Sequence, residues 1–531
     1  MKTFTPEISW HNRLPALSLD ISTPIDSDND ATYRVATGGN DCRVYIWHLT
    51  IVKDQLPDIR IRAGLRRHQR SVGAVRFSSQ HVLASGDDDG YIYLWKYKMD
   101  DRQELDYSGS DFLNEDGFED METWQNFRVL RGHIEDICDL AWSKDGQYLL
   151  SGSVDNSAIL WDTFRGSKIW CSDLIKGYVQ GVSIDPHNKY MVALSSDRAL
   201  RVYNFVDKRL VYATRRTNVL QDYKAIFCDD TVQTFCRRLE FSPDGQYLVA
   251  PTSRLIEREQ PRPGKVTSTE VIELDDEENG DGDINVIGDK EVKEEGTSPK
   301  TTSNEITPAQ KKKPINIVLV FKRTNMKKPV HYYPTGREVA LCTRFSPVVY
   351  KLRGNGGPNF WTLPYRVIFA VGTSRSIIIY DSQQPTPIAY ISQIHLARLT
   401  DLSWSHDGQV LMVTSYDGYS TLITFEKDEF GEIYTGSLLE PAEETSADET
   451  EASVKGKKRS KGPKDGSKKE KLSAQEGDIQ DGGSDGHNEQ SEEQKDSKAA
   501  ANKKATPKKI VPTRLPESST IFKYLIKKPA D

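Results

Sequence analysis

The stretch Asp136–Asp162, DICDLAWSKDGQYLLSGSVDNSAILWD, predicts three short β-strands joined by tight turns. Residues 137–142 form the first expected strand, 148–151 the second and 157–161 the third. An Asp-Gly pair at 145–146 separates the first two strands. Asp-Gly pairs accept the positive φ that a tight turn needs, so this stretch is typical of antiparallel hairpins.

The spacing between Asp155 and Trp161 recurs along the chain. The same six-residue separation joins an Asp to an aromatic or aliphatic residue in four further segments: Asp41 and Trp47, Asp89 and Trp95, Asp197 and Tyr203, and Asp417 and Ile423. An internal repeat with a period near 40 residues is typical of propeller blades. The sequence therefore predicts an all-β, seven-bladed WD40 β-propeller over residues 1–430.

Each predicted blade ends near an anchor residue: Trp47, Trp95, Trp161, Tyr203, Phe321, Tyr380 and Phe425. The N-terminal segment 8–21, ISWHNRLPALSLDI, either contributes to blade one or supplies the outer strand that closes the ring. Ring closure would remove the exposed sheet edges that a linear array leaves.

Two acidic insertions interrupt the blades, and we expect both to be disordered. They cover about residues 100–122 and 255–313. From Glu273 to Glu295 the second holds eleven acidic residues and two lysines, so it cannot bury enough apolar surface to offset its ordering entropy. These insertions either keep loops soluble or attract a basic partner, of which histones are an abundant example. Residues 431–531 form a predicted disordered polar tail.

Composition narrows the classes of function. The net charge of −7 argues against a protein that coats DNA, so contact with DNA would be mainly indirect. No secretory signal and no run of about 18 apolar residues is present, so we expect an intracellular protein with no membrane partner. The six cysteines form no CxxC pair and are expected to be reduced. Without an HExxH, EF-hand or P-loop motif, we predict no cofactor and no metal.

Two sets of side chains could carry chemistry: His68, Ser85, Asp89 and Trp95, and His133, Ser151, Asp155 and Trp161. A hydrolase triad is the alternative interpretation, but one active site needs one nucleophile, and the set is duplicated. No GxSxG nucleophile elbow occurs. We therefore interpret both sets as buried structural hydrogen-bond networks and predict that the protein is not an enzyme. The remaining carboxylates of Asp87–Asp89 are expected to face solvent rather than to bind a metal.

A strongly basic run covers Lys455–Lys471 within the predicted tail. The interpretation that we favour is a nuclear import signal, which could also contact nucleic-acid phosphates. Its basic residues are Lys457, Lys458, Arg459, Lys461, Lys468 and Lys469. The alternative is a solvated charge run. No aromatic residues interleave, so base stacking is not indicated.

Several blocks outside the generic repeat resemble one family closely. FCRRLEFSPDG at 235–245, LPYRVIFAV at 363–371, YVQGVSIDP at 178–186 and the segment EISWHNRLPALSLD resemble the WD-repeat middle (p60-type) subunit of chromatin assembly factor 1. The resemblance covers roughly residues 1–430. It implies a nuclear, non-catalytic scaffold in a heterotrimer with a large subunit and a small histone-binding WD subunit.

That resemblance also implies a biological process and a set of partners. The complex would deliver histones H3 and H4 to DNA during replication and repair-coupled nucleosome assembly. The histone-regulator family, whose members act independently of replication, has a similar propeller and stays open as an alternative.

The tail segment Thr506–Leu515 is similar to the family's B-domain peptide, which docks on the anti-silencing histone chaperone. The residues that would make this contact are Lys508, Lys509, Ile510, Val511, Pro512 and Leu515. β-Strand addition fits them, since apolar side chains would fill pockets and lysines would meet acidic groups. Arg514 departs from the family pattern, which often has Pro there. The alternative is a chance apolar break in a basic tail.

Two further resemblances are weaker. The final segment SSTIFKYL at 518–525 distantly resembles a peptide that binds the sliding clamp, but lacks the Gln and the second aromatic residue. A substrate receptor of a cullin ubiquitin ligase is the alternative function in another class. Such receptors typically carry Trp-Asp-x-Arg, whereas here Trp161-Asp162 is followed by Thr163-Phe164, and Arg165 stands one position late.

Overall fold

The computed structural model describes residues 1–8, 10–25, 31–52, 55–98, 120–173, 175–217, 224–225, 227–228, 235–255, 315–354 and 359–439. Over these ranges the regular elements are strands, and no helix is found. The strands form seven four-stranded antiparallel sheets and one two-stranded sheet. The prediction of an all-β, seven-bladed propeller is confirmed. Among the described residues, no helix is long and apolar enough to cross a membrane.

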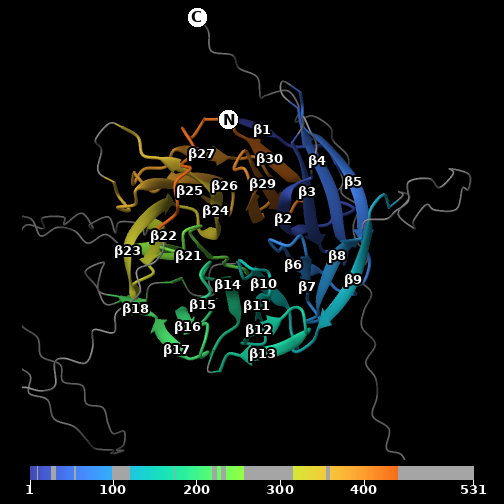
Figure 1. Cartoon of the computed structure of the whole chain (residues 1–531), viewed down its shortest axis with the longest axis horizontal. Helices are drawn as coiled ribbons and strands as arrows, with labels where there is room; N and C mark the ends of the chain where they lie inside the picture. Colours follow the sequence, from blue (N-terminus) through green and yellow to red (C-terminus); the bar gives the residue numbers. More distant parts are fainter. Residues whose placement is uncertain are drawn as a thin grey trace, which may run out of the picture. The chain divides into compact units, whose positions relative to one another are not determined.

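The seven sheets stand around a central axis like blades (Figure 1). Within each blade the first strand is innermost, and each strand pairs with the next in the sequence. Blade one contains β2 (Ala16–Ile25), β3 (Ala31–Gly39), β4 (Val44–Ile51) and β5 (Asp58–Leu65), and blade two contains β6 (Val72–Phe77), β7 (Leu83–Asp87), β8 (Ile92–Lys98) and β9 (Thr123–Leu130). Blade three contains β10 (Ile137–Trp142), β11 (Tyr148–Ser153), β12 (Ala158–Asp162) and β13 (Ser167–Cys171), and blade four contains β14 (Val179–Ile184), β15 (Tyr190–Ser195), β16 (Ala199–Asn204) and β17 (Leu210–Thr214).

The remaining blades follow the same order, apart from the last. Between blades four and five, β18 (Arg216–Thr217) pairs with β19 (Lys224–Ala225). Blade five contains β20 (Glu240–Phe241), β21 (Tyr247–Leu255), β22 (Ile315–Lys322) and β23 (Asn325–Gly336). Blade six contains β24 (Ala340–Lys351), β25 (Tyr365–Thr373), β26 (Ser376–Asp381) and β27 (Ala389–Ser392). Blade seven contains β28 (Leu399–Trp404), β29 (Val410–Ser415), β30 (Ser420–Thr424) and the N-terminal strand β1 (Lys2–Phe4).

The N-terminal strand closes the ring. β1 pairs with β30 in antiparallel register, with Thr3 opposite Ile423, so the start of the chain supplies the outer strand of blade seven. The segment 8–21 was expected either to join blade one or to close the ring, and the structure assigns these two roles to different strands. β2 joins blade one, and the closing strand β1 lies before that segment. Closure in this way pairs the outer side of β30 and gives blade seven its fourth strand.

The predicted Asp-Gly turns connect the first and second strands of their blades. Gly146, Gly245 and Gly408 have φ values of 70°, 67° and 69°, which explains the choice of glycine at these positions. A Ser and an Asp stabilise each turn locally. In blade three, the Asp145 carboxylate accepts hydrogen bonds from the Ser143 hydroxyl and from the N–H of residue 147.

Apolar residues fill the spaces between neighbouring blades. Ala36 and Ile46 of blade one, for example, share one buried cluster with Val75 and Leu83 of blade two. Each blade thus buries one face against the blade before it and the other against the blade after it. The core is consequently distributed around the ring, and the axis is lined by the innermost strands.

The first insertion is shorter at its C-terminal end than the sequence predicted. Residues 99–119 lie outside the described residues, but 120–122 are described and are bound to blade one. Glu122 is almost fully buried, with its carboxylate 2.8 Å from Arg34 Nη2 and 2.6 Å from His48 Nε2. Trp124 Nε1 donates to the same carboxylate at 2.8 Å. An acidic residue assigned to a disordered loop is therefore a buried structural anchor.

The boundary predicted at residue 430 also needs correction. The backbone of Glu432 accepts a hydrogen bond from Lys351 N–H at 2.8 Å, and Tyr434 N–H donates to the Val349 carbonyl at 2.9 Å. Tyr434 and Leu438 pack against the apolar cluster of blades five and six. These apolar residues attach the segment to the ring, in contrast to the polar composition of the chain that follows. The second insertion, over 256–314, and residues 440–531 lie outside the described residues.

Candidate partner-binding sites of the propeller

The predicted set in blade three forms one connected hydrogen-bond network. His133 Nε2 lies 2.7 Å from Ser151 Oγ, and His133 Nδ1 lies 2.8 Å from Asp155 Oδ2. Trp161 Nε1 donates to Ser151 Oγ at 2.8 Å. Burial alone would raise the pKa of Asp155, but its hydrogen bond and charge interaction with His133 lower the pKa to about 2. The buried serine hydroxyl already accepts the indole N–H, as a structural network requires.

In blade two the network uses a different aspartate from the one predicted. His68 Nε2 lies 2.6 Å from Ser85 Oγ, and Trp95 Nε1 donates to Ser85 at 2.8 Å. His68 Nδ1, however, lies 2.7 Å from Asp87 Oδ2 rather than from Asp89. Asp89 is exposed and contacts Arg70 at 3.4 Å. The assignment of Asp89 to this network was therefore wrong, as was the expectation that Asp87 faces solvent.

The physical reason lies in the turn after β7. Asp87 Oδ1 accepts the N–H groups of Asp89 and Tyr91 at 3.1 and 2.9 Å, while its other oxygen meets the histidine. One buried carboxylate thus serves the turn and the imidazole together. In blade three two residues share these contacts: Ser153 Oγ accepts the N–H of Asp155 at 3.1 Å, and Asp155 accepts the N–H of Ser157 at 3.0 Å and contacts His133.

Sequence reasoning missed two further networks of the same kind. In blade one His11 joins Asp41 at 2.8 Å and Thr37 at 3.0 Å, and Trp47 Nε1 donates to Thr37 at 2.9 Å. In blade seven His395 joins Asp417 and Thr421. In blade one threonine stands in place of the serine, and in blade seven the threonine lies on the third strand, β30, so neither set matched the pattern. Since the arrangement recurs in four blades, it stabilises the blades and does not mark one site.

Buried ion pairs connect the innermost strands across the central axis. The carboxylate of Asp401 in β28 lies 2.8 Å from Arg76 Nη1, 3.4 Å from Arg238 Nη1 and 3.7 Å from Arg344 Nη2. Asp139 of β10 lies 3.3 Å from Arg238 and 3.4 Å from Arg76. Burial alone would raise the pKa of Asp401, but the three guanidinium groups hold that pKa well below its usual range. We call these five side chains the axial network.

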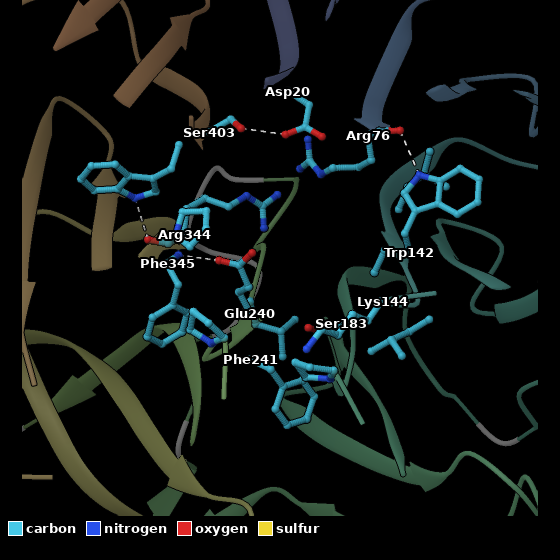
Figure 2. Close-up of a pocket in the computed structure, with 18 of the residues that line it drawn as sticks. Asp20, Arg76, Trp142, Lys144, Ser183, Glu240, Phe241, Arg344, Phe345 and Ser403 are labelled. Carbon is cyan, nitrogen blue, oxygen red and sulfur yellow. Dashed lines mark hydrogen bonds between the residues drawn. The ribbon is translucent and has the colours of Figure 1, made fainter. Parts of the chain in front are cut away.

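One end of the axis opens into a cavity of about 510 Å³, shown in Figure 2. We call it the aromatic mouth because an aromatic ring from each of five blades lines it: Phe77, Trp142, Phe241, Phe345 and Trp404. The indole N–H groups of the two tryptophans donate to the backbone carbonyls of Arg76 and Arg344, at 2.9 and 3.1 Å. These bonds fix the rings at the ends of the innermost strands.

Two carboxylates face the aromatic mouth. Asp20 accepts the Ser403 hydroxyl at 2.7 Å and the N–H of Phe77 at 2.7 Å, and Glu240 accepts the N–H of Phe345 at 2.6 Å. Burial raises the pKa of Asp20, although Arg76 opposes the shift. Burial likewise raises the pKa of Glu240 to about 7, more strongly than Arg344 lowers it. Arg76, Arg344 and Lys144 line the same cavity, so the aromatic mouth holds charges of both signs.

The other end of the same strands borders a second cavity of about 260 Å³. β10 contributes Ile137 and Cys138 to this cavity and Leu140 and Trp142 to the aromatic mouth, so the two cavities lie at opposite ends of the axis. Asp88 and Asp136 line the smaller cavity together with the half-exposed Phe235. Burial, reinforced by Asp136, raises the pKa of Asp88 to about 6.

The predicted functional residues of the tail lie outside the described residues. This applies to the basic run at 455–471 and to the B-domain-like peptide at 506–515. Within the described ranges, no group of three or more His, Cys, Asp or Glu side chains is placed to hold a metal ion. The candidate sites of the described chain are therefore the two mouths of the axis.

A closed ring of seven four-stranded blades, with the His–Ser/Thr–Asp network repeated among them, places the chain in the class of WD-repeat β-propellers. The chain belongs to the CAF1B/HIR1 β-propeller family, whose domain matches residues 1–276 and 294–430. The predicted resemblance to the p60-type subunit of chromatin assembly factor 1 is thereby confirmed.

Individual relatives show how far this similarity extends. The chain is 35% identical over 449 residues to the B-type subunit of chromatin assembly factor 1 from Gallus gallus, covering 81% of this chain and 69% of that protein. It is 27% identical over 504 residues to the corresponding subunit from Saccharomyces cerevisiae, with 86% and 92% covered. The chain is 25% identical over 430 residues to "Protein HIR1" of Yarrowia lipolytica, and this match covers 77% of this chain but 36% of that protein.

Proposed function

We propose that this protein is a non-catalytic scaffold subunit of a nuclear histone chaperone complex that deposits histones H3 and H4 on DNA. The observation that carries the proposal is the similarity to the B-type subunit of chromatin assembly factor 1, which extends over 81% of the chain and through all seven blades. The relative's name describes a subunit of a chromatin assembly factor. A subunit of such a complex needs several partner-binding surfaces and no active site.

The described propeller supports a binding role. The hydroxyls of Ser85 and Ser151 accept tryptophan N–H groups, and the arginines of the axial network are paired with aspartates. Both mouths of the axis combine aromatic rings with carboxylates. Both linings also hold arginines, so these surfaces combine aromatic rings with charges of both signs, which suits protein partners.

Composition supports a separate role for each of the other segments. The eleven acidic residues between Glu273 and Glu295 would screen the positive charge of H3–H4 before transfer to DNA. The propeller would hold the large subunit and the small histone-binding WD subunit. Residues 506–515 would recruit the anti-silencing histone chaperone, and residues 455–471 would direct nuclear import. The sliding clamp is a further partner, through residues 518–525.

Affinity purification of the tagged chain from nuclear extract, followed by quantitative mass spectrometry, tests the scaffold role. We expect the large subunit, the small WD subunit and histones H3 and H4 in near-equal amounts. A preparation rich in cullin components and lacking histones would contradict the proposal and favour the ligase receptor.

The tail contact has its own test. An Ile510→Ala, Leu515→Ala variant should lose the anti-silencing chaperone in a pull-down while keeping the other partners. The matched control is Lys457→Ala, Lys458→Ala, which should retain the chaperone and reduce nuclear accumulation of a fluorescent fusion. Undiminished chaperone binding by the first variant would refute the tail role.

A further inference from the structure

We propose that a groove between blades two and three binds an acidic segment of a partner protein, in which a carboxylate stands beside a large apolar side chain. We call this site the interblade groove. The carboxylate would pair with Arg128 and Lys96, and the apolar side chain would pack against Phe164. The inference goes beyond the proposed function and does not depend on histones, which are basic and would be repelled here.

The interblade groove lies at the junction of two neighbouring blades (Figure 1). Blade two contributes Lys96 of β8 and both Phe127 and Arg128 of β9. Blade three contributes Tyr148 of β11 and residues 162–165, which end β12 and begin the turn to β13. The cavity has a volume of about 650 Å³, which accommodates a large side chain together with adjoining backbone.

The residues that line the groove carry an excess of positive charge. They include three cations, Lys96, Arg128 and Arg165, and one carboxylate, Asp162. Asp162 Oδ1 accepts the N–H of Arg165 at 2.8 Å, and Asp162 Oδ2 lies 3.8 Å from Arg165 Nε. The acidic group is thus committed to its own turn and to Arg165, which leaves Lys96 and Arg128 uncompensated within the groove.

The turn between β10 and β11 borders the groove without changing this balance. Gly146 lines the groove, and Lys144 of the same turn lines the aromatic mouth. The carboxylate of this turn, Asp145, accepts hydrogen bonds from the Ser143 hydroxyl and from the N–H of Gln147. Lys144 and Asp145 therefore add one charge of each sign beside the groove.

Neutral acceptors hold Arg128 in place. Its Nε donates to the Phe164 carbonyl at 3.3 Å, and its Nη1 donates to the Phe127 carbonyl at 2.9 Å. The side chain also packs on Gly166, where a Cβ atom would lie 3.0 Å from Arg128 Cδ. Because a guanidinium has further N–H groups, Arg128 can donate to a carboxylate while these bonds remain. Within the described ranges, neither Arg128 nor Lys96 is paired with a carboxylate.

Aromatic rings supply the apolar part of the groove. Phe164 is 83% exposed, and Phe127 and Tyr148 are half-buried in the same lining. A partner that covers an exposed ring removes apolar surface from water, which favours binding. Aromatic residues and arginine are the side chains most enriched at protein interfaces, so their combination here indicates a protein partner.

The composition of the lining distinguishes an acidic protein segment from other charged ligands. A lysine-rich segment would meet three cations, of which two are uncompensated. A nucleic acid needs a series of phosphate contacts along its backbone, whereas this groove offers few cations between apolar walls. An acidic segment with a large apolar residue satisfies the charge and the rings together.

The test uses the full chain and two fluorescein-labelled peptides with identical Gly/Ser-rich flanks. One carries a central Glu-Phe-Glu and the other Gln-Phe-Gln, which has a similar shape without the charge. By fluorescence anisotropy at low ionic strength, we expect the acidic peptide to bind about tenfold more tightly. Equal affinity for the two peptides, or no binding of either, would overturn the proposal.

Protein variants locate the binding. Lys96→Gln with Arg128→Gln removes two positive charges, so the acidic peptide should bind about tenfold more weakly. Lys96→Gln alone leaves the contacts of Arg128 in place and should weaken binding about threefold. The matched control is Lys327→Gln with Lys328→Gln, which removes the same charge from exposed positions of β23 in blade five and should leave affinity unchanged. Thermal unfolding confirms that each variant is folded.

Further results separate the two parts of the contact and the class of ligand. Phe164→Ala should weaken binding of the acidic peptide about fivefold, and unchanged affinity would contradict the role of the ring. Undiminished binding by the Lys96, Arg128 variant would place the site elsewhere and refute the assignment. A labelled DNA oligonucleotide that bound more tightly than the acidic peptide, and lost affinity in that variant, would identify a nucleic-acid site in place of a protein-docking site.

Discussion

Arg76 and Asp401 face each other across the central axis, with Nη1 of the arginine 2.8 Å from Oδ2 of the aspartate, although 325 residues separate them in the sequence. Arg76 lies in blade two and Asp401 in blade seven, so this ion pair spans blade one, which lies between them. Arg238 of blade five and Arg344 of blade six approach the same carboxylate. Asp401 therefore connects four blades.

Asp401→Asn should strongly destabilise the propeller. The substitution leaves three buried guanidinium groups without their shared countercharge, at a cost of about 3–5 kcal/mol in the free energy of unfolding. Urea denaturation followed by tryptophan fluorescence measures this change. Asp58→Asn is the control, since Asp58 and Arg60 form an exposed pair and the cost should stay below about 1 kcal/mol. Similar stabilities for the two variants would refute the importance of the axial network.

Asp87→Asn and Asp89→Asn should differ sharply in stability. Asp87 is buried and joins His68 at 2.7 Å while accepting two turn N–H groups, so its replacement should cost about 1–3 kcal/mol. Asp89 is exposed, and its replacement should change stability by no more than about 0.5 kcal/mol. If Asp89→Asn were the more destabilising of the two variants in thermal and urea unfolding, the assignment of Asp89 to the blade-two network would be correct after all.

Glu240→Gln should stabilise the protein at alkaline pH. The folded-state pKa of Glu240, raised to about 7 by burial, exceeds its ordinary value of 4.5, so the folded state binds this proton more tightly than the unfolded state. Wild-type stability therefore falls as pH rises from about 4.5 to about 7. We expect the variant to gain about 2 kcal/mol at pH 8 and almost nothing at pH 4.

The control for this pH dependence is Glu135→Gln, an exposed glutamate at the opposite end of the axis. Its difference from the wild type should remain small at both pH values. A gain for Glu240→Gln that was the same at pH 4 and pH 8 would show that the residue does not titrate as described.

Glu122→Ala should detach the end of the first insertion from blade one. Burial alone would raise the pKa of Glu122, but hydrogen bonds with His48 and Arg34 lower it to about 2. Its stabilising effect is thus present above about pH 4.5 and is lost as pH falls toward 2. At pH 7 we expect a loss of about 3 kcal/mol, because Arg34 is left buried and unpaired.

Asp120→Ala provides the comparison, since this neighbouring carboxylate accepts one N–H, from Gly64, at an exposed position. Its replacement should cost less than about 1 kcal/mol. Equal losses for the two variants, measured by urea denaturation at pH 7, would contradict the description of Glu122 as the anchor.

The ring could be predicted from sequence because its determinants are local. Asp-Gly turns and short apolar runs define hairpins within a few residues, and their repetition defines blades. The network of blade three was predictable for the same reason. The role of Asp87 could not be predicted, because any of three consecutive aspartates could serve the turn. Only the backbone geometry determines that Asp87 is the one that contacts His68.

The axial network depends on contacts that the sequence does not reveal. A local signal was present, since Asp139-Leu140-Ala141-Trp142 and Asp401-Leu402-Ser403-Trp404 share the pattern Asp-Leu-x-Trp on innermost strands. The pairing of these aspartates with arginines from other blades arises only when the ring closes. Glu122 was missed because acidic composition concealed a single buried carboxylate.

The most direct test of the scaffold account is histone deposition in cell extract from which this protein has been immunodepleted. Plasmid supercoiling during DNA replication reports the number of nucleosomes assembled. We predict that depletion abolishes supercoiling of newly replicated plasmid, and that the purified full chain, added with its co-purifying partners, restores it. Supercoiling that continued unchanged in the depleted extract would contradict the account.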